Sequence, residues 1–209
     1  MTGAAGTGFF TALSLILAIG AQNSFILRQG LLRSHVFVLV LFCAISDAIL
    51  IITGVIGFGA VVSLYPAVLI GMSLLGAAFL FTYGAIRLKA AWLGDYVMEL
   101  ACQGMELRPA LWMIFACTWL NPHVYLDTLV LIGAVSTQYE SSEKLAFGFG
   151  ASTASFIFFF SLGYGARLLA PIMQTPFTWR MLDVTICGIM WIIAIGLVLN
   201  LVTHWHSSF

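Results

Sequence analysis

Long apolar stretches constrain this chain more than any other feature of its sequence. A helix that crosses a bilayer needs about twenty mostly apolar residues, because each residue advances the helix by about 1.5 Å. Six stretches meet this requirement: residues 3–26, 36–63, 67–88, 110–134, 145–170 and 182–203. They predict an all-α integral membrane protein with about six transmembrane helices.

The composition agrees with this fold class. Of the 209 residues, 62% are hydrophobic and only 8% are charged, whereas roughly a quarter of a soluble domain is charged. A chain of this size cannot bury so much apolar surface in its own core, so the surplus must face the lipid bilayer. The formal net charge is zero, which gives no basic field for a nucleic acid.

The connections between the stretches are short, so we expect one transmembrane domain over residues 1–209. An even division gives halves 1–105 and 106–209 with three helices each. Because three is odd, the halves must run in opposite senses across the membrane, as in the inverted repeats of many transporters. Two observations favour this: paired glycines in the third and sixth stretches (Gly76 and Gly84, Gly188 and Gly196), and polar interruptions in the first and fourth.

The basic residues predict the orientation. If the six stretches alternate, seven of the eight basic residues fall on one side: Arg28, Arg33, Arg87, Lys89, Arg108, Arg167 and Arg180. That side is expected to be cytoplasmic, which places both termini outside, the C-terminus in the periplasm. If the polar end of the first stretch instead makes it re-entrant, only five helices span, and the C-terminus still lies outside.

The two interruptions are expected to break their helices. Proline disfavours helix at the residue before it, so the fourth helix should stop near Asn121 and restart at Pro122 with Asn121 as its N-cap. Gly20, Gln22 and Asn23 lie in the matching interruption of the first stretch. A helix N-terminus inside the membrane presents unpaired N–H groups and a partial positive charge, which suits a carboxylate. The alternative is a simple proline kink.

Two carboxylates stand inside apolar stretches. Asp47 lies about twelve residues into the second stretch, near the middle of the membrane, and Asp127 follows the break in the fourth. An ionisable residue inside a membrane is costly, so both are candidate functional residues. The alternative is a carboxylate held by neighbouring hydroxyl or amide groups for helix packing. His123 lies one turn before Asp127 and could pair with it or simply line the break.

Together these residues indicate a basic amino acid as substrate. Two carboxylates without an interior Lys or Arg to neutralise them favour a cation, and two helix N-termini favour an anion. A lysine or arginine molecule offers both charges. The same residues, Asp47, Asp127 and His123, could instead bind and release the protons of an antiport cycle.

At these motifs the chain resembles the lysine exporter (LysE) superfamily, within its lysine and arginine exporter branch. The resemblance rests on residues 20–25 (GAQNSF), 28–30 (RQG), 43–47 (CAISD) and 118–128 (TWLNPHVYLDT). It implies a gradient-driven exporter of lysine or arginine in the bacterial inner membrane. The neutral-amino-acid branch carries a Pro-Gly-Pro type motif in the first helix, where this chain keeps Gly20 but lacks both prolines.

Other classes remain as alternatives. An exporter of neutral amino acids such as threonine or homoserine is the main one, and a channel or structural membrane protein is more distant. The chain has no HExxH, no GxSxG and no CxxC pair, so we expect no enzyme, no catalytic residue, no metal site and no cofactor. The sequence does not choose between lysine and arginine. A homodimer is expected because each protomer is small.

Overall fold

The computed structural model describes residues 2–17, 20–58, 66–93 and 105–206. Within these ranges every regular element is helical. The elements are α1 (Thr2–Ile16), α2 (Ala21–Leu31), α3 (Val36–Thr53), the π-helix η1 (Gly54–Phe58), α5 (Pro66–Leu93), α7 (Leu107–Trp119), α8 (Pro122–Tyr125), the π-helix η2 (Leu126–Leu131), α9 (Ile132–Ser136), α10 (Ser141–Gly165), the 3₁₀ helices η3 (Ala166–Leu169) and η4 (Ile172–Gln174), and α11 (Pro176–His206).

Four helical segments of the described chain are long and apolar enough to cross a membrane: Val36–Gly57, Ser73–Leu93, Ser142–Leu169 and Pro176–Leu199. A fifth crossing is possible if α1 and α2, which are bent by 82° at their break, form one span. The segment Pro122–Ser136 is apolar but shorter. The predicted all-α fold is therefore confirmed for the described residues, with four or five candidate membrane spans.

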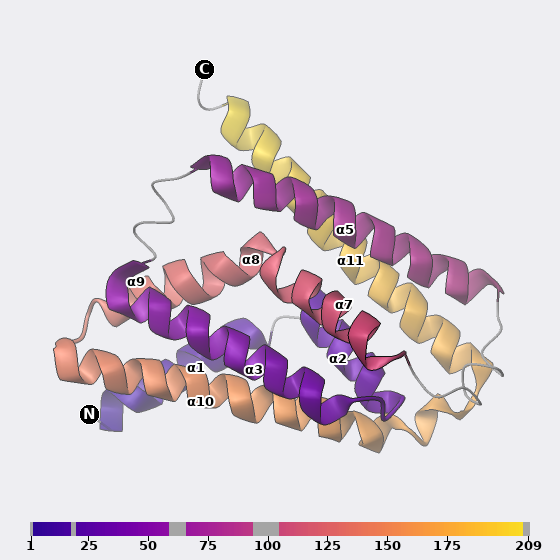
Figure 1. Cartoon of the computed structure of the whole chain (residues 1–209), viewed down its shortest axis with the longest axis horizontal. Helices are drawn as coiled ribbons and strands as arrows, with labels where there is room; N and C mark the ends of the chain where they lie inside the picture. Colours follow the sequence, from indigo (N-terminus) through magenta and orange to yellow (C-terminus); the bar gives the residue numbers. More distant parts are fainter. Residues whose placement is uncertain (1, 18–19, 59–65, 94–104, 207–209) are drawn as a thin grey trace.

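The chain runs back and forth between two ends of the molecule (Figure 1). α3, the succession α7 to α9, and α11 run in one sense, while α1 with α2, α5 and α10 run in the other. α5 and α11 pack along each other as a pair that is set against the remaining helices. α1, α3 and α10 pack together on the other side of the molecule.

Small residues allow the closest contacts between these helices. A Cβ atom on Gly8 of α1 would lie 2.0 Å from the Phe147 carbonyl oxygen of α10, and one on Gly150 would lie 2.0 Å from the Ala5 carbonyl oxygen. Without Cβ atoms at both positions the two backbones touch directly. Close packing at small residues is typical of helices in lipid, because the lipid tails are as apolar as the helix surfaces and no hydrophobic effect drives the helices together.

The glycine pairs of the third and sixth stretches lie in different packing environments. A Cβ atom on Gly76 would meet the Leu120 carbonyl oxygen at 2.3 Å, and one on Gly84 would meet the Trp191 ring. Cβ atoms on Gly188 and Gly196 would meet nothing within 4 Å. Their equal spacing therefore does not reflect equal packing.

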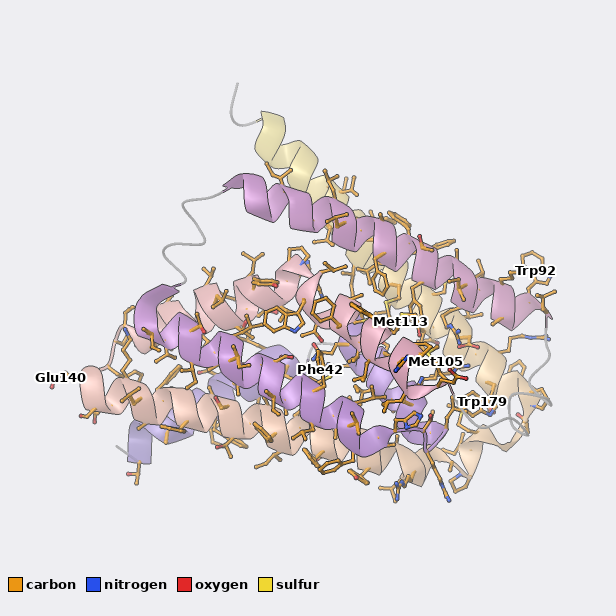
Figure 2. The ribbon with its side chains drawn as sticks, viewed as in Figure 1. Phe42, Trp92, Met105, Met113, Glu140 and Trp179 are labelled. Carbon is orange, nitrogen blue, oxygen red and sulfur yellow. The ribbon has the colours of Figure 1, made fainter. Side chains whose placement is uncertain are left out.

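Aromatic and charged side chains mark the ends of the molecule. Figure 2 shows Trp92 and Trp179 at one end and Glu140 at the other. The end with Trp92 and Trp179 is where α2, α5 and α10 finish and where α7 and α11 begin. Tryptophan is typical of the boundary between lipid and water, so the exposed Trp92 suits this end to a membrane surface.

Candidate functional site

A cavity of about 250 Å³ lies where the two broken helices meet α3. Its lining includes every residue that the sequence singles out for binding, namely Gly20, Gln22, Asn23, Asp47, Asn121, His123 and Asp127. It is smaller than the roughly 300–1,000 Å³ clefts that hold drug-sized ligands, so it suits a molecule the size of an amino acid. Three separate parts of the chain, at residues 20–23, 47 and 121–128, thus converge on one space.

The N-terminus of α2 forms one wall of the cavity. Its N-cap, Gly20, is extended with φ −119° and ψ 179°, and makes no side-chain cap. The first intrahelical hydrogen bond runs from the Ser24 N–H to the Gly20 carbonyl at 3.0 Å. The N–H groups of Ala21 and Gln22 precede it, so this helix end can bind an anion.

Asn23 joins the two sides of the break in the first stretch. Its Nδ2 donates a hydrogen bond of 2.8 Å to the carbonyl oxygen of Ile16, the last residue of α1. A carbonyl at a helix C-terminus has no partner within its own helix. Asn23 therefore stabilises the bend between α1 and α2 and faces the cavity at the same time.

The second break lies where the sequence predicts it, but its helix end is already occupied. α7 ends at Trp119 and α8 begins at Pro122, with Asn121 as N-cap. The Asn121 Oδ1 accepts from the His123 N–H at 3.1 Å, and its carbonyl accepts from the Val124 N–H at 3.1 Å. Since Pro122 has no N–H, the first turn of α8 keeps few donors for a ligand. The N-terminus of α2 is the better site for a carboxylate.

Asp47 is held in a defined orientation. The residue is only 3% exposed, and its Oδ2 accepts a hydrogen bond of 3.0 Å from Ser155 Oγ of α10. The neighbouring Ser46 accepts from Trp119 Nε1 at 3.2 Å, which ties α3 to the end of α7. Asp47 lines the cavity, so its carboxylate is available there on a rigid support.

Asp127 enters the cavity from an irregular part of its helix. It lies in the π-helix η2 and is half-buried. π-Helical turns are rare and often occur at functional sites. His123 lies one helical turn before it, and both face the cavity. Thr128, also in the lining, donates its hydroxyl to the Val124 carbonyl.

Apolar side chains complete the walls. Leu15, Ile16, Val124, Ile132, Phe159 and Ile193 line the cavity. Such walls favour the aliphatic part of a ligand, while the polar groups fix its orientation. The cavity therefore combines two carboxylates, a helix N-terminus and an apolar surface.

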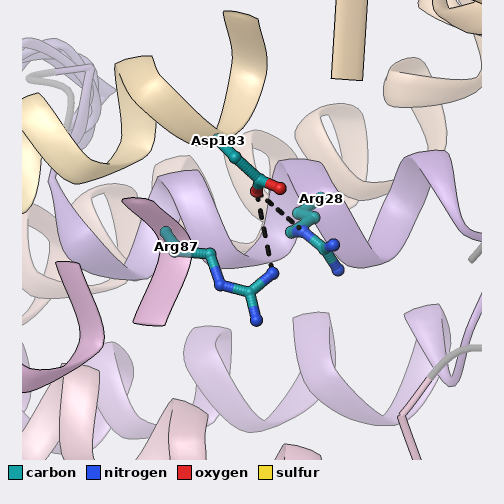
Figure 3. A network of polar contacts seen from close by, with 3 residues as sticks. All are labelled: Arg28, Arg87 and Asp183. Atoms are coloured by element: carbon teal, nitrogen blue, oxygen red, sulfur yellow. Dashed lines mark hydrogen bonds and ion pairs between the residues drawn. The ribbon is translucent and has the colours of Figure 1, made fainter. Parts of the chain in front are cut away.

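The sequence reading of the basic residues needs one correction. We expected Arg28 at the cytoplasmic edge and no basic side chain in the interior, yet Arg28 and Arg87 are only 5% and 9% exposed. Both form ion pairs with Asp183 Oδ1, at 3.4 and 3.6 Å (Figure 3). These arginines pair there and do not line the cavity. The cavity carboxylates thus have no Lys or Arg beside them in the described lining.

Two other residues were not identified as polar partners from the sequence. These are Ser155 and Asp183. The signal for Asp183 was present, since it stands at the beginning of the sixth apolar stretch. In the described part of the chain, no three His, Cys, Asp or Glu side chains gather as metal ligands would.

Comparison with known proteins identifies relatives that match nearly the whole chain. The arginine exporter protein ArgO of Yersinia enterocolitica is 39% identical over 194 residues, which cover 91% of this chain and 93% of that protein. ArgO of Salmonella paratyphi A and of Salmonella typhimurium are each 37% identical over 206 residues, which cover 97% of this chain and 96% of theirs. No solved structure matches.

The family model described as LysE type translocator matches residues 13–201, which include both breaks, both cavity carboxylates and Asp183. A translocator moves a solute across a membrane and transforms no substrate, and the apolar helices place this chain in a membrane with several crossings. The chain belongs to the LysE type translocator family.

Proposed function

We propose that this protein exports basic amino acids, arginine first among them, out of the bacterial cytoplasm across the inner membrane. The observation that carries the proposal is the pair of carboxylates, Asp47 and Asp127, on one cavity whose described lining holds no Lys or Arg. The relatives described above are named as arginine exporters, which supports arginine as substrate. Lysine has the same two kinds of charge and is proposed as a second substrate.

Each charged group of arginine has a counterpart in the cavity. The guanidinium and the α-ammonium are assigned to Asp47 and Asp127, and the substrate carboxylate to the N-terminus of α2 at Ala21 and Gln22. The methylene groups lie against the apolar walls. A neutral amino acid has one cationic group and would leave one carboxylate without a partner, which is costly away from water. The amides of Gln22, Asn23 and Asn121 supply the remaining hydrogen bonds.

The same carboxylates provide a simple means of coupling. If a proton and the cationic substrate occupy Asp47 or Asp127 in turn, export of one requires entry of the other. His123, one turn from Asp127, is the residue best placed to pass such a proton. This makes a proton antiporter the proposed mechanism, with the membrane gradient as the energy source.

The proposed membrane arrangement has six crossings in two inverted halves. α1 with α2 forms the first crossing, and α7 with the segment Pro122–Ser136 forms the fourth, each broken at the cavity. The end at which α2, α5 and α10 finish carries most of the basic residues and is assigned to the cytoplasm. The C-terminus then lies in the periplasm.

Efflux from preloaded cells tests the proposal. Cells that lack their own basic-amino-acid exporters are loaded with dipeptides of Arg, Lys, Thr or Leu, and the amino acid that leaves the cell is measured with and without this protein. We expect accelerated efflux of arginine and lysine only. Acceleration of threonine or leucine with no effect on arginine would refute the basic-substrate assignment.

A further inference from the structure

The buried charges of Arg28, Arg87 and Asp183 lie outside the substrate cavity and need a separate explanation. Arg28 belongs to α2, Arg87 to α5 and Asp183 to α11. Figure 3 shows Arg28 Nε and Arg87 Nη1 facing the same carboxylate oxygen of Asp183. The contact thus connects the short helix α2 to the α5–α11 pair, which packs against the remaining helices as a unit.

α2 separates the cavity from one end of the molecule. Its first residues line the cavity, and Arg28 stands eight residues after Gly20, about 12 Å further along the helix at 1.5 Å per residue. The helix ends at Leu31, just before α3 begins at Val36. Nearly all of its side chains are buried. α2 therefore lies between the cavity and the end that is assigned to the cytoplasm.

The space along α2 is filled by two apolar clusters. On the cavity side, Phe25 and Ile26 pack with Cys43, Tyr83 and Ile186 in the main core. Around Arg28, a smaller cluster is formed by Leu31, Ala166, Trp179 and the partly buried Leu27 and Leu182. These clusters surround α2 with close-packed side chains.

The two described ion pairs of Asp183 are long. Both arginines share a single oxygen of Asp183 at 3.4 and 3.6 Å, longer than a good charged hydrogen bond. Arg87 Nε and Nη1 are buried without a hydrogen-bond partner in the described structure. Arg28 and Arg87 also lie over the Trp179 and Tyr83 rings, 5.8 and 5.4 Å from the ring centroids. A buried ion pair is a weak source of stability, because the cost of removing both charges from water offsets their attraction.

We propose that Asp183, through Arg28 and Arg87, is a positioning residue that locks α2 as a closed gate between the cavity and the cytoplasmic end. The lock deepens the proposed function, because it assigns the residues that control access to the transport cavity. Release of Asp183 frees α2 to move relative to α1, to which it stands at 82°.

Cys43 provides a natural reporter of the gate. It is 0% exposed, packs in the same cluster as Phe25 of α2, and stands one helical turn before Asp47. A thiol reacts as its thiolate, which forms only in contact with water, so a closed gate should keep Cys43 inert. A chain in which Cys102, Cys117 and Cys187 are replaced by alanine leaves Cys43 as the only target.

The experiment measures the rate at which N-ethylmaleimide modifies Cys43 in that chain, reconstituted in lipid vesicles. Asp183→Asn should accelerate the modification by about tenfold or more, because removal of one member of a buried ion pair strongly destabilises the arrangement that the pair holds. Asp183→Glu, which keeps the carboxylate, should retain the slow rate. Arg180→Gln, an exposed arginine one turn away on α11, is the matched control and should also remain slow.

If Asp183→Asn leaves the rate of Cys43 modification unchanged, the lock is overturned. Equal acceleration in Asp183→Asn and Asp183→Glu also overturns it, because it would indicate a role in packing alone. If the Asp183→Asn variant does not insert into the membrane, the Arg87→Gln variant decides the question. It retains the Arg28–Asp183 pair and should accelerate the modification of Cys43. No acceleration in this variant overturns the lock. The measurement contains no transport step, so its result tests the lock independently of the substrate assignment.

Discussion

Ser155 of α10 donates its hydroxyl to Asp47 Oδ2 of α3 at a distance of 3.0 Å, and both residues are buried. The bond joins the innermost carboxylate of the cavity to a helix that packs along the whole of α3. It fixes the orientation of that carboxylate before any substrate arrives. Binding then costs less ordering of the side chain, which is the benefit of a preorganised site.

Ser155→Ala should therefore weaken substrate binding without preventing membrane insertion. A hydrogen bond to a charged group contributes about 1.5–3 kcal/mol, so we expect the KM for arginine efflux to rise by about tenfold or more while the maximal rate changes less. Ser161→Ala removes an exposed hydroxyl from the same helix and should behave like the parent. A KM unchanged by Ser155→Ala would mean that the hydroxyl serves packing only.

Asn121→Ala should destabilise the protein through its helix cap. Loss of the bond from the His123 N–H to Asn121 Oδ1 costs about 1 kcal/mol. The melting temperature of the detergent-solubilised protein should fall. Asn121→Asp keeps the accepting oxygen, so its melting temperature should stay close to that of the parent. A fall of the same size in both variants would show that the cap is not the cause.

Gly76→Ala, a change on α5, should disturb the break between α7 and α8. The new Cβ would lie 2.3 Å from the Leu120 carbonyl oxygen, a backbone atom that cannot move freely. Overpacking of this kind costs about 1–3 kcal/mol, so both stability and arginine efflux should decrease.

Gly71→Ala is the matched control for this change. It lies on the same helix, and its Cβ would meet nothing within 4 Å, so it should leave both properties unchanged or slightly raise stability. Parent-like behaviour of Gly76→Ala would show that the contact between α5 and Leu120 is not needed to shape the break.

The sequence predicted the parts of the site that depend on local rules. Proline fixes where a helix can begin, and the side chain of Asn121 suits the cap before it, so the second break is found at the predicted residues. The cost of a carboxylate in an apolar stretch singled out Asp47 and Asp127, and both face the cavity. That residues 20–23 and 121–128 face one another also follows the expectation of two broken helices.

What the sequence did not predict depends on packing between distant segments. Arg28 lies near the end of an apolar stretch, where an arginine ordinarily reaches water. The approach of Asp183, 155 residues away along the chain, gives it a buried ion-pair partner. The hydrogen bond from Ser155 to Asp47 likewise depends on the packing of α10 against α3. The equal spacing of the glycines suggested equal roles, but the environments of Gly76 and Gly188 differ.

The central claim is that Asp47 and Asp127 hold the cationic groups of the substrate. The most direct test is arginine counterflow in proteoliposomes that contain the purified protein, the Asp47→Asn variant or the Asp127→Asn variant. Glu140→Gln, which removes an exposed carboxylate at the start of α10, serves as the control. We expect the parent and Glu140→Gln to exchange arginine, and both aspartate variants to insert normally but lose the exchange. Full exchange by both aspartate variants would contradict the account.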